Sequence, residues 1–174
     1  EQRLMDLSRY RDWDAPALVV AEAGVNHEGN LDTALRMVRE AAAAGAGAIK
    51  FQTYTASRLT TRSSRAYWDR TKESTESQFE LFSRYDRFGE EEYRRIAEEC
   101  DRAGIAFTTS AFDVESIDWL DELVAAFKIA SGDITNVPLL ARVARTGKPV
   151  LLSTGASTLG EIDEGIGCRQ CGSV

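Results

Sequence analysis

Short apolar segments alternate with amphipathic helical segments along most of this chain. The segments that read as strands are residues 18–25, 48–54, 105–110, 126–131 and 149–153. The segments with the three- and four-residue apolar spacing of helices are residues 31–44, 90–102, 114–123 and 137–145, and a last helix starts near Leu159. Gly45, Gly104 and Gly147 follow three of these helices, as helix C-caps do. Strands that alternate with helices indicate parallel βαβ units.

The alternation predicts an α/β fold, and the chain length favours part of a barrel. A complete (β/α)8 barrel of the TIM type has about 250 residues, or roughly 31 for each βα unit. The 174 residues of this chain therefore correspond to a barrel truncated to about five βα units with parallel strands. A doubly wound open sheet is the alternative, because five strands could also build one.

The pattern divides the chain into a lead-in over 1–16, a partial barrel over 17–167 and an unstructured tail over 168–174. Residues 55–88 interrupt the barrel with a polar segment that is rich in Ser, Thr and Arg and contains several aromatic residues. An insertion of this length without clear periodicity is usually functional or mobile. It could form a lid over a site, or it could pack its aromatic side chains on the rim of the barrel.

The composition excludes several classes of protein. The chain has 21 Lys and Arg against 28 Asp and Glu, and its net charge of −7 argues against a nucleic-acid partner. No apolar run approaches the roughly 20 residues of a membrane helix, and no secretory leader is recognisable.

Three cysteines do not make a disulfide framework, so we expect a cytoplasmic protein. Cys168 and Cys171 form a lone C-x-x-C, which favours an inert end over a zinc or redox site. Because the chain begins with Glu1, we expect a processed chain or a piece of a longer protein.

Polar side chains stand at the carboxyl end of every predicted strand. They are Glu22, Lys50, Gln52, Thr109, Ser110, Lys128, Ser131, Asp133, Ser153 and Thr154. Catalytic groups of parallel βα folds project from these strand ends. We therefore predict one shared site at this edge of the sheet.

Two of the four lysines, Lys50 and Lys128, lie inside apolar strands. A buried ammonium group is costly unless it is paired. The two lysines could form structural ion pairs with Glu22 or Asp133, or both could wait for an anionic ligand such as phosphate or carboxylate. Glu22 and Asp133 could instead act as an acid or a base.

The loops after the last two strands are suited to an anion. Ser131-Gly132 and Ser153-Thr154-Gly155 combine glycine, which lets backbone N–H groups approach a ligand, with hydroxyl donors. The only histidine, His27, lies in the loop after the first strand, where a structural role or a substrate contact is favoured over metal binding. Motifs of serine hydrolases, dinucleotide-binding proteins and P-loop proteins are absent from the sequence.

Four segments resemble the N-acetylneuraminate (sialic acid) synthase family, in the order of the chain. They are VAEAGVNHEGN from Val20, AIKFQTY from Ala48, KIASGD from Lys128 and LLSTG from Leu151. The resemblance runs from about residue 17 to residue 166 and extends to the legionaminate, pseudaminate and spore-coat polysaccharide synthases. It implies a (β/α)8 barrel that condenses phosphoenolpyruvate with an N-acetylated amino-sugar aldehyde, such as N-acetylmannosamine, and releases phosphate.

The resemblance also implies roles for the strand-end residues. Lys128, Ser131 and Ser153 would hold phosphoenolpyruvate, and Lys50 would meet its carboxylate end or the reacting centre. Ser110 and Phe112 would belong to the substrate-binding set, although Ala111 between them replaces a proline that is common in the family.

The remaining candidate residues would serve the second substrate and the proton transfers. Gln52 and Glu22 would contact the sugar or metal-bound water, and Asp133 would manage the water or a proton. Glu22, Lys50 and Asp133 are therefore the predicted catalytic residues.

A divalent metal, Mn²⁺ or Mg²⁺, and a homodimer of the full-length protein are implied as well. The metal-ligating histidines of the family lie on later strands, so we predict no metal ligand in this chain. We expect the chain alone to be inactive, with two open strand edges. The alternatives are another phosphoenolpyruvate-condensing 3-deoxy-ulosonate synthase, or a non-catalytic fragment that binds an anion.

Overall fold

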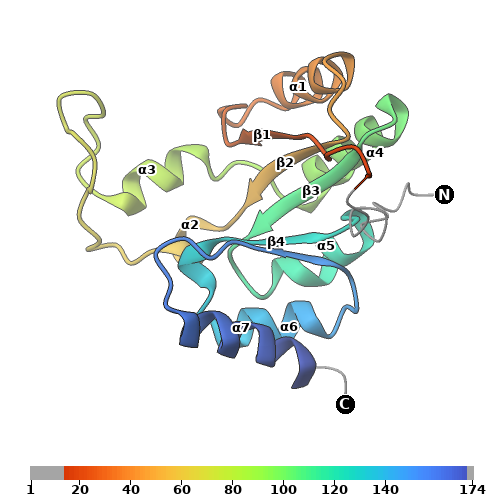
Figure 1. Cartoon of the computed structure of the whole chain (residues 1–174). Coiled ribbons are helices and arrows are strands. Elements are labelled where there is room, and N and C mark those ends of the chain that lie inside the picture. The colour runs from red at the N-terminus through yellow and green to blue at the C-terminus, as the bar shows by residue number, and fades with distance from the viewer. Residues whose placement is uncertain (1–13, 172–174) are drawn as a thin grey trace.

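Five parallel strands form one sheet in the order in which they follow along the chain (Figure 1). The structure, a computed structural model, describes residues 14–171. The strands are β1 (Val20–Gly24), β2 (Ala48–Thr53), β3 (Ala106–Ala111), β4 (Phe127–Ile129) and β5 (Val150–Leu152). A doubly wound sheet reverses its strand order at a switch point, whereas the order here is β1-β2-β3-β4-β5. The partial TIM-type barrel is therefore confirmed, and the doubly wound alternative is excluded.

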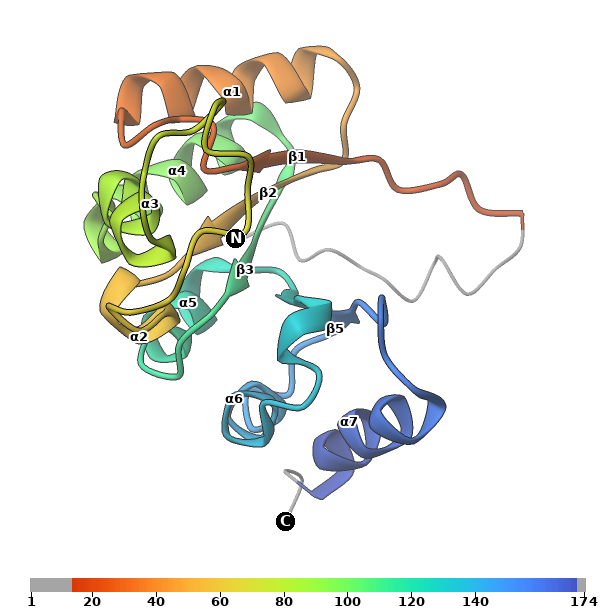
Figure 2. The ribbon, with the colours of Figure 1, turned by 90° about the vertical axis from the view of Figure 1, so that its left-hand side faces the viewer.

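The helices of the chain are α1 (Leu31–Ala43), α2 (Ala56–Leu59), α3 (Gln78–Tyr85), α4 (Glu90–Ala103), α5 (Ser116–Leu123), α6 (Val137–Ala144) and α7 (Leu159–Cys171). Apart from α2 and α3, they follow the convex side of the curved sheet in an arc that runs from α1 to α7 (Figure 2). Gly45, Gly104 and Gly147 all have positive φ angles, which confirms the predicted helix ends.

Helix α7 corrects the prediction of an unstructured tail over 168–174. The helix continues to Cys171, and Cys168 packs against the main hydrophobic cluster. Gly165 lets α7 approach the chain closely, since a Cβ atom there would lie 3.2 Å from the carbonyl oxygen of Ile134. This packing holds a segment that shows no helical periodicity in its sequence. The rest of the predicted tail, 172–174, lies outside the described residues.

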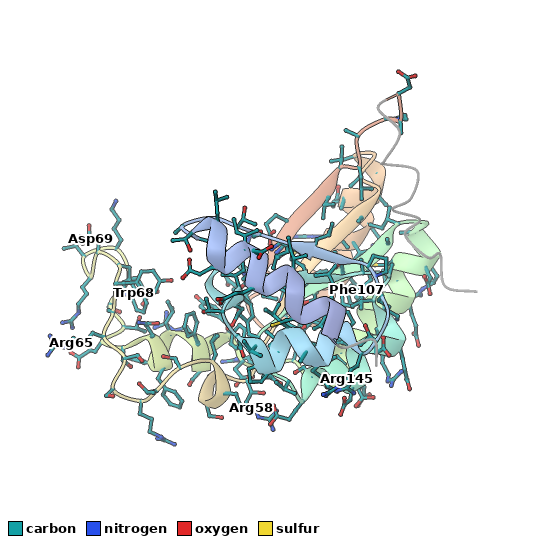
Figure 3. All side chains as sticks on the ribbon, turned by 60° about the horizontal axis from the view of Figure 1, so that its bottom comes forward. Arg58, Arg65, Trp68, Asp69, Phe107 and Arg145 are labelled. Carbon is teal, nitrogen blue, oxygen red and sulfur yellow. The ribbon has the colours of Figure 1, made fainter. Side chains whose placement is uncertain are left out.

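The insertion at 55–88 projects from the carboxyl end of the sheet and contains α2 and α3 (Figure 1). Arg65, Trp68 and Asp69 lie at its far end (Figure 3). Near the sheet, the ring of Phe82 packs edge-on against Tyr54 at 5.7 Å, so this part of the insertion packs on the rim. Tyr67 at the far end is 76% exposed. Helix α3 begins at a local cap, since the Ser77 side chain accepts a hydrogen bond from the backbone N–H of Glu80 at 3.1 Å.

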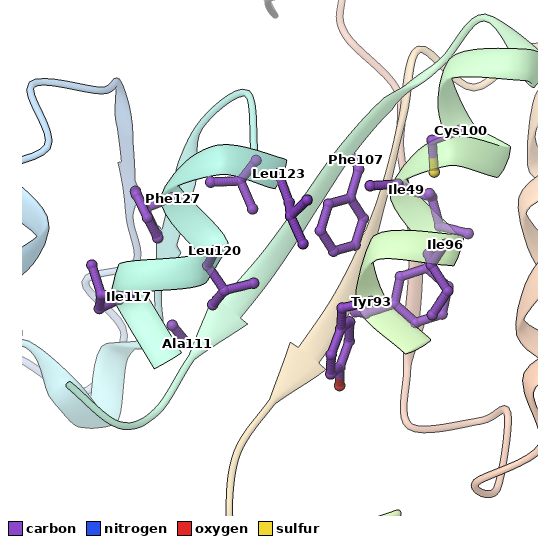
Figure 4. Close-up of a cluster of buried hydrophobic side chains, with 14 of the residues drawn as sticks. Ile49, Tyr93, Ile96, Cys100, Phe107, Ala111, Ile117, Leu120, Leu123 and Phe127 are labelled. Carbon is purple, nitrogen blue, oxygen red and sulfur yellow. The ribbon is translucent and has the colours of Figure 1, made fainter. Parts of the chain in front are cut away.

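The hydrophobic core fills the space between the convex face of the sheet and the helices (Figure 4). Ile49, Phe107 and Phe127 point from the strands into this space and meet Ile96 and Leu120 from the helices. All five side chains are at most 4% exposed. Successive side chains of a strand point to opposite faces of the sheet, so the residues between these core residues point to the concave face.

The concave face changes its character along the strands. At the amino ends, Ala48, Ala106 and Ala126 form a small buried cluster with Leu18 and Val20. Toward the carboxyl ends, the residues that alternate with the core become polar and charged. The predicted site residues are therefore concentrated at one edge of the concave face.

Candidate functional site

Lys50 and Lys128 project from the same face of the sheet. Gln52 is in register with Ser110, and Ser110 is in register with Lys128. Partners in register share a face, and Lys50 lies two residues before Gln52, so it shares that face too. The strands bring together both cations and both polar side chains, as the strand-end pattern predicts.

The ammonium group of Lys50 is held by two side chains. Its Nζ lies 2.7 Å from Oε2 and 2.9 Å from Oε1 of Glu22, and it donates to Ser110 Oγ at 3.4 Å. The Lys50 side chain is 13% exposed, whereas that of Glu22 is 58% exposed. The buried cation is thus compensated by a carboxylate from the edge strand β1.

The ammonium group of Lys128 has a different environment. Its Nζ donates to the carbonyl oxygen of Ile129 at 2.6 Å, and no carboxylate lies in ion-pair distance within residues 14–171. Burial lowers the pKa of Lys128, the nearby charge of Lys50 lowers it further, and Glu22 acts in the opposite direction. Lys128 is therefore a partly desolvated cation that an additional anion would stabilise.

The loops after β4 and β5 lie beside each other. A Cβ atom on Gly155 would lie 3.6 Å from Ser131 Oγ, so the two loops meet at van der Waals distance. The backbone N–H of Ser153 donates to the carbonyl oxygen of Ile129 at 3.1 Å, the same oxygen that Lys128 contacts. The structure thus gathers Lys128, Ser131 and Ser153 around one corner of the sheet edge.

Asp133 forms no ion pair with Lys50 or Lys128 among the described residues. It lies in the 3-10 helix Ser131–Asp133, and its Oδ1 accepts a hydrogen bond from Asn136 Nδ2 at 3.2 Å. Burial raises the pKa of its carboxyl group, and the Asn136 hydrogen bond opposes this. The predicted alternative of an ion pair between Asp133 and a lysine is not found, because the described ion pairs of Lys50 involve Glu22 alone.

Phe112 is positioned by the neighbouring strand despite the missing proline. Its backbone N–H donates to the carbonyl oxygen of Thr53 at 3.1 Å, and its half-buried ring lies edge-on to Tyr54 at 6.5 Å. The hydroxyl of Tyr93 donates to the carbonyl oxygen of Gln52 at 2.6 Å. Helix α4 therefore holds the end of β2 in place beside this loop.

Two supporting residues escaped the sequence analysis. The buried Asp113 accepts hydrogen bonds from the backbone and hydroxyl of Ser116 at 2.9 and 2.7 Å, and it lies 3.5 Å from Arg58 of α2. Asn136 caps α6 and also contacts Asp133. A polar residue three positions before a helical N–H is the capping signal that could have identified both.

His27 lies in the core and does not reach the lysines. It is 2% exposed, its ring stacks on Phe88 at 4.2 Å, and it is tilted against Phe51 at 5.9 Å. Its Nδ1 accepts a hydrogen bond from the backbone N–H of Gly29 at 3.1 Å. Of the two roles that the sequence favours, this geometry supports the structural one.

The buried imidazole predicts a loss of stability in mild acid. Burial lowers the pKa of His27 to about 4, below the value of about 6.5 in an unfolded chain. Between about pH 4 and about pH 6.5, the unfolded chain therefore binds a proton at this histidine that the folded chain does not bind. The free energy of unfolding keeps the full contribution of His27 above pH ~6.5, and it falls by up to about 3 kcal/mol as the pH approaches about 4. Urea unfolding at a series of pH values measures this loss. In His27→Gln the histidine contribution should disappear, and equal pH dependence in both proteins would contradict the assignment.

A second hollow of the described chain is unsuited to a small anion. A cavity of about 350 Å³ lies between β4, β5, α6 and α7, on the side of the sheet opposite Lys128, and apart from Thr154 its lining is almost entirely apolar. Within residues 14–171, His, Cys, Asp and Glu do not gather in groups that could hold a metal ion. The helices described here are too short or too polar to cross a membrane.

Comparisons with known proteins show the family to which the chain is similar. A model of the NeuB family matches residues 37–171. The N,N'-diacetyllegionaminic acid synthase of Campylobacter jejuni is 38% identical over 152 residues, which are 86% of this chain and 45% of that protein. The structure of N-acetylneuraminic acid (sialic acid) synthetase from Leptospira borgpetersenii, in complex with citrate, is similar with a TM-score of 0.78. It is 35% identical and covers 91% of this chain and 51% of that chain.

A more distant structural neighbour supports the fold alone. A truncated 3-deoxy-D-arabino-heptulosonate 7-phosphate synthase from Thermotoga maritima has a TM-score of 0.63 at 15% identity. The chain spans about half the length of the relatives that it matches.

Proposed function

The chain belongs to the NeuB family, and from this premise we propose that it supplies the phosphoenolpyruvate-binding half of a nonulosonic acid synthase. The proposed reaction condenses phosphoenolpyruvate with an N-acetylated amino-sugar aldehyde, similar to N-acetylmannosamine, and yields a nonulosonic acid and phosphate. The names of the relatives support this class of product, since they include synthases of legionaminic acid and sialic acid.

One observation carries the proposal: Lys50 and Lys128 lie on the same face at the carboxyl edge of the sheet. Phosphoenolpyruvate bears a phosphate and a carboxylate, so a pair of ammonium groups matches its two charged ends. The partly desolvated Lys128 would bind the phosphate with the hydroxyls of Ser131 and Ser153. Lys50, oriented by Ser110, would meet the carboxylate end.

The acceptor sugar would bind on the mouth side of these lysines. Gln52 and Phe112 stand at the strand ends next to Lys50, and Glu22 is exposed toward solvent. In the proposed reaction the enol carbon attacks the aldehyde carbon, and the aldehyde oxygen takes up a proton. The carbon that bears the phosphate oxygen becomes cationic, and water adds to it and loses a proton. The bond between this carbon and the phosphate oxygen then breaks, which releases phosphate and leaves a keto group. A carboxyl group with a raised pKa, such as Asp133, is suited to exchange a proton with this water.

The divalent metal implied by the family does not fit the described residues. Metal-ligating side chains do not cluster there, and His27 is enclosed by Phe51 and Phe88. The steps above therefore use only side chains of this chain. A cytoplasmic location and a homodimer of the whole protein are further parts of the proposal.

Titration with phosphoenolpyruvate tests the proposed site. Amide and side-chain NMR signals of Lys50, Lys128, Ser131 and Ser153 should shift at millimolar ligand, because these groups would contact the two charged ends. Inorganic sulfate is the control for a single anionic group and should bind more weakly. The absence of any shift at millimolar phosphoenolpyruvate would contradict the site.

A second measurement separates binding from catalysis. The 174-residue chain should release no phosphate from phosphoenolpyruvate and an amino sugar in the presence of Mn²⁺, because it forms five of the eight βα units of a barrel. Turnover by the pure chain would contradict the expected inactivity. Binding without turnover would agree with the half-barrel proposed here, and a whole relative assayed in parallel provides the positive control.

A further inference from the structure

The Lys50 ammonium already has a carboxylate partner in this structure. Both carboxylate oxygens of Glu22 lie within 2.9 Å of Lys50 Nζ. In the proposed function, the carboxylate end of phosphoenolpyruvate binds at the same ammonium. The protein's own carboxylate and the ligand's carboxylate therefore compete for one cation.

The charge of Glu22 also reaches the second lysine. The nearby charge of Lys50 lowers the pKa of Lys128, whereas the charge of Glu22 raises it, so Glu22 offsets part of the repulsion between the two ammonium groups. Glu22 thus lowers the positive potential of the whole pair. An anion that approaches the pair meets less attraction than two bare ammonium groups would exert.

Glu22 can leave this position when another anion takes its place at Lys50. Its side chain is 58% exposed, compared with 13% for Lys50. It belongs to β1, which pairs with β2 on one side only within the described sheet. A carboxylate that is more than half exposed regains its hydration when it turns outward, and the carboxylate of the ligand then compensates the buried ammonium in its place.

We propose that Glu22 is an internal competitor that sets the affinity of the lysine pair for anions, and that ligand binding releases its carboxylate toward the mouth of the barrel. This inference rests on the proposed function, since it assumes an anionic ligand at Lys50. The released carboxylate then becomes a free hydrogen-bond acceptor beside the bound anion. Binding of the anion therefore creates an acceptor for hydroxyl groups of a second ligand.

Calorimetric titration of phosphoenolpyruvate into the 174-residue chain tests the proposal. Glu22→Gln removes the competing charge and should bind phosphoenolpyruvate about five- to tenfold more tightly than the wild type. The matched control is Glu28→Gln, which changes the net charge equally from the exposed loop after β1. The control should change affinity by less than about twofold, because charges at the solvent-exposed surface are screened.

A double-mutant cycle assigns the effect to the ion pair. In a Lys50→Met background, Glu22→Gln should improve affinity less than it does when Lys50 is present, because the contested ammonium is gone and only the effect of Glu22 on Lys128 remains. Circular dichroism verifies that each variant is folded. As a second readout in the wild type, the side-chain carboxyl ¹³C signal of Glu22 should shift during titration, which requires no variant.

The outcomes separate this inference from the proposed function. If the wild type binds phosphoenolpyruvate and Glu22→Gln binds it equally or more weakly, the internal competitor is overturned and the proposed function stays intact. The same holds if the wild type binds and the carboxyl signal of Glu22 does not shift. If Glu22→Gln improves the affinity for phosphoenolpyruvate equally with and without Lys50, the internal competitor is also overturned. If neither the wild type nor Glu22→Gln binds phosphoenolpyruvate, both the inference and the proposed function fail.

Discussion

Replacement of Lys128 by methionine should weaken phosphoenolpyruvate binding by about 100-fold or more. Hydrogen bonds to charged groups contribute about 1.5–3 kcal/mol each, and in the proposed site this ammonium faces the phosphate together with Ser131 and Ser153. Methionine preserves much of the length of the side chain but removes the charge. The reduced affinity should be measurable by calorimetry or by NMR titration.

The same substitution should leave the free energy of unfolding unchanged or increase it. Burial lowers the pKa of Lys128, so the fold disfavours its charged form, and an apolar side chain removes that cost. Lys72→Met is the matched control, because Lys72 is exposed in the insertion and its loss changes the net charge equally. Equal losses of affinity in both variants, or a large loss of stability in Lys128→Met, would contradict an anion-binding role.

Replacement of Phe51 by alanine should destabilise the chain by about 3–5 kcal/mol. Phe51 is fully buried on the convex face, where its ring lies 5.9 Å from His27 and 6.2 Å from Phe107. Loss of the ring removes apolar burial and leaves a cavity between β2 and the helices. A urea-induced unfolding curve measures the change as a shift of the midpoint.

Gentler variants keep this prediction measurable when the alanine variant is too unstable to purify. Ile49→Val on the same convex face should cost about 1 kcal/mol. Val19→Ala is the exposed control, since Val19 is 60% exposed, and surface changes usually stay within about 0.5 kcal/mol. A cost for Phe51→Ala no greater than that for Val19→Ala would show that the convex face is not the core.

Much of the fold was predictable because local signals agree with the tertiary structure. The apolar spacing of α1 and α4 and the glycines after them predicted both helices within one or two residues. Strands β4 and β5 are shorter than predicted, at three residues each. The chain leaves the β4 ladder at Ala130, because Ser131–Asp133 turn into a 3-10 helix.

The partners of the site residues were less predictable. The sequence shows that Lys50 and Lys128 interrupt apolar strands, but it offers both Glu22 and Asp133 as counter-ions. The register of β1 with β2 places Glu22 opposite Lys50, whereas Asp133 turns toward Asn136. His27 is similarly ambiguous in sequence, and only the packing of Phe88 against its ring shows that it is structural.

The alternation of strands and helices and the polar residues at each strand end are readable in the amino-acid sequence, because period and residue type are properties of neighbouring positions. The contacts of Lys50 with Glu22, of Ser131 with Gly155 and of α7 with Ile134 are known only from the folded chain. These contacts join positions that are far apart along the chain, and they depend on strand register and close packing. Neither strand register nor close packing can be predicted from local sequence patterns.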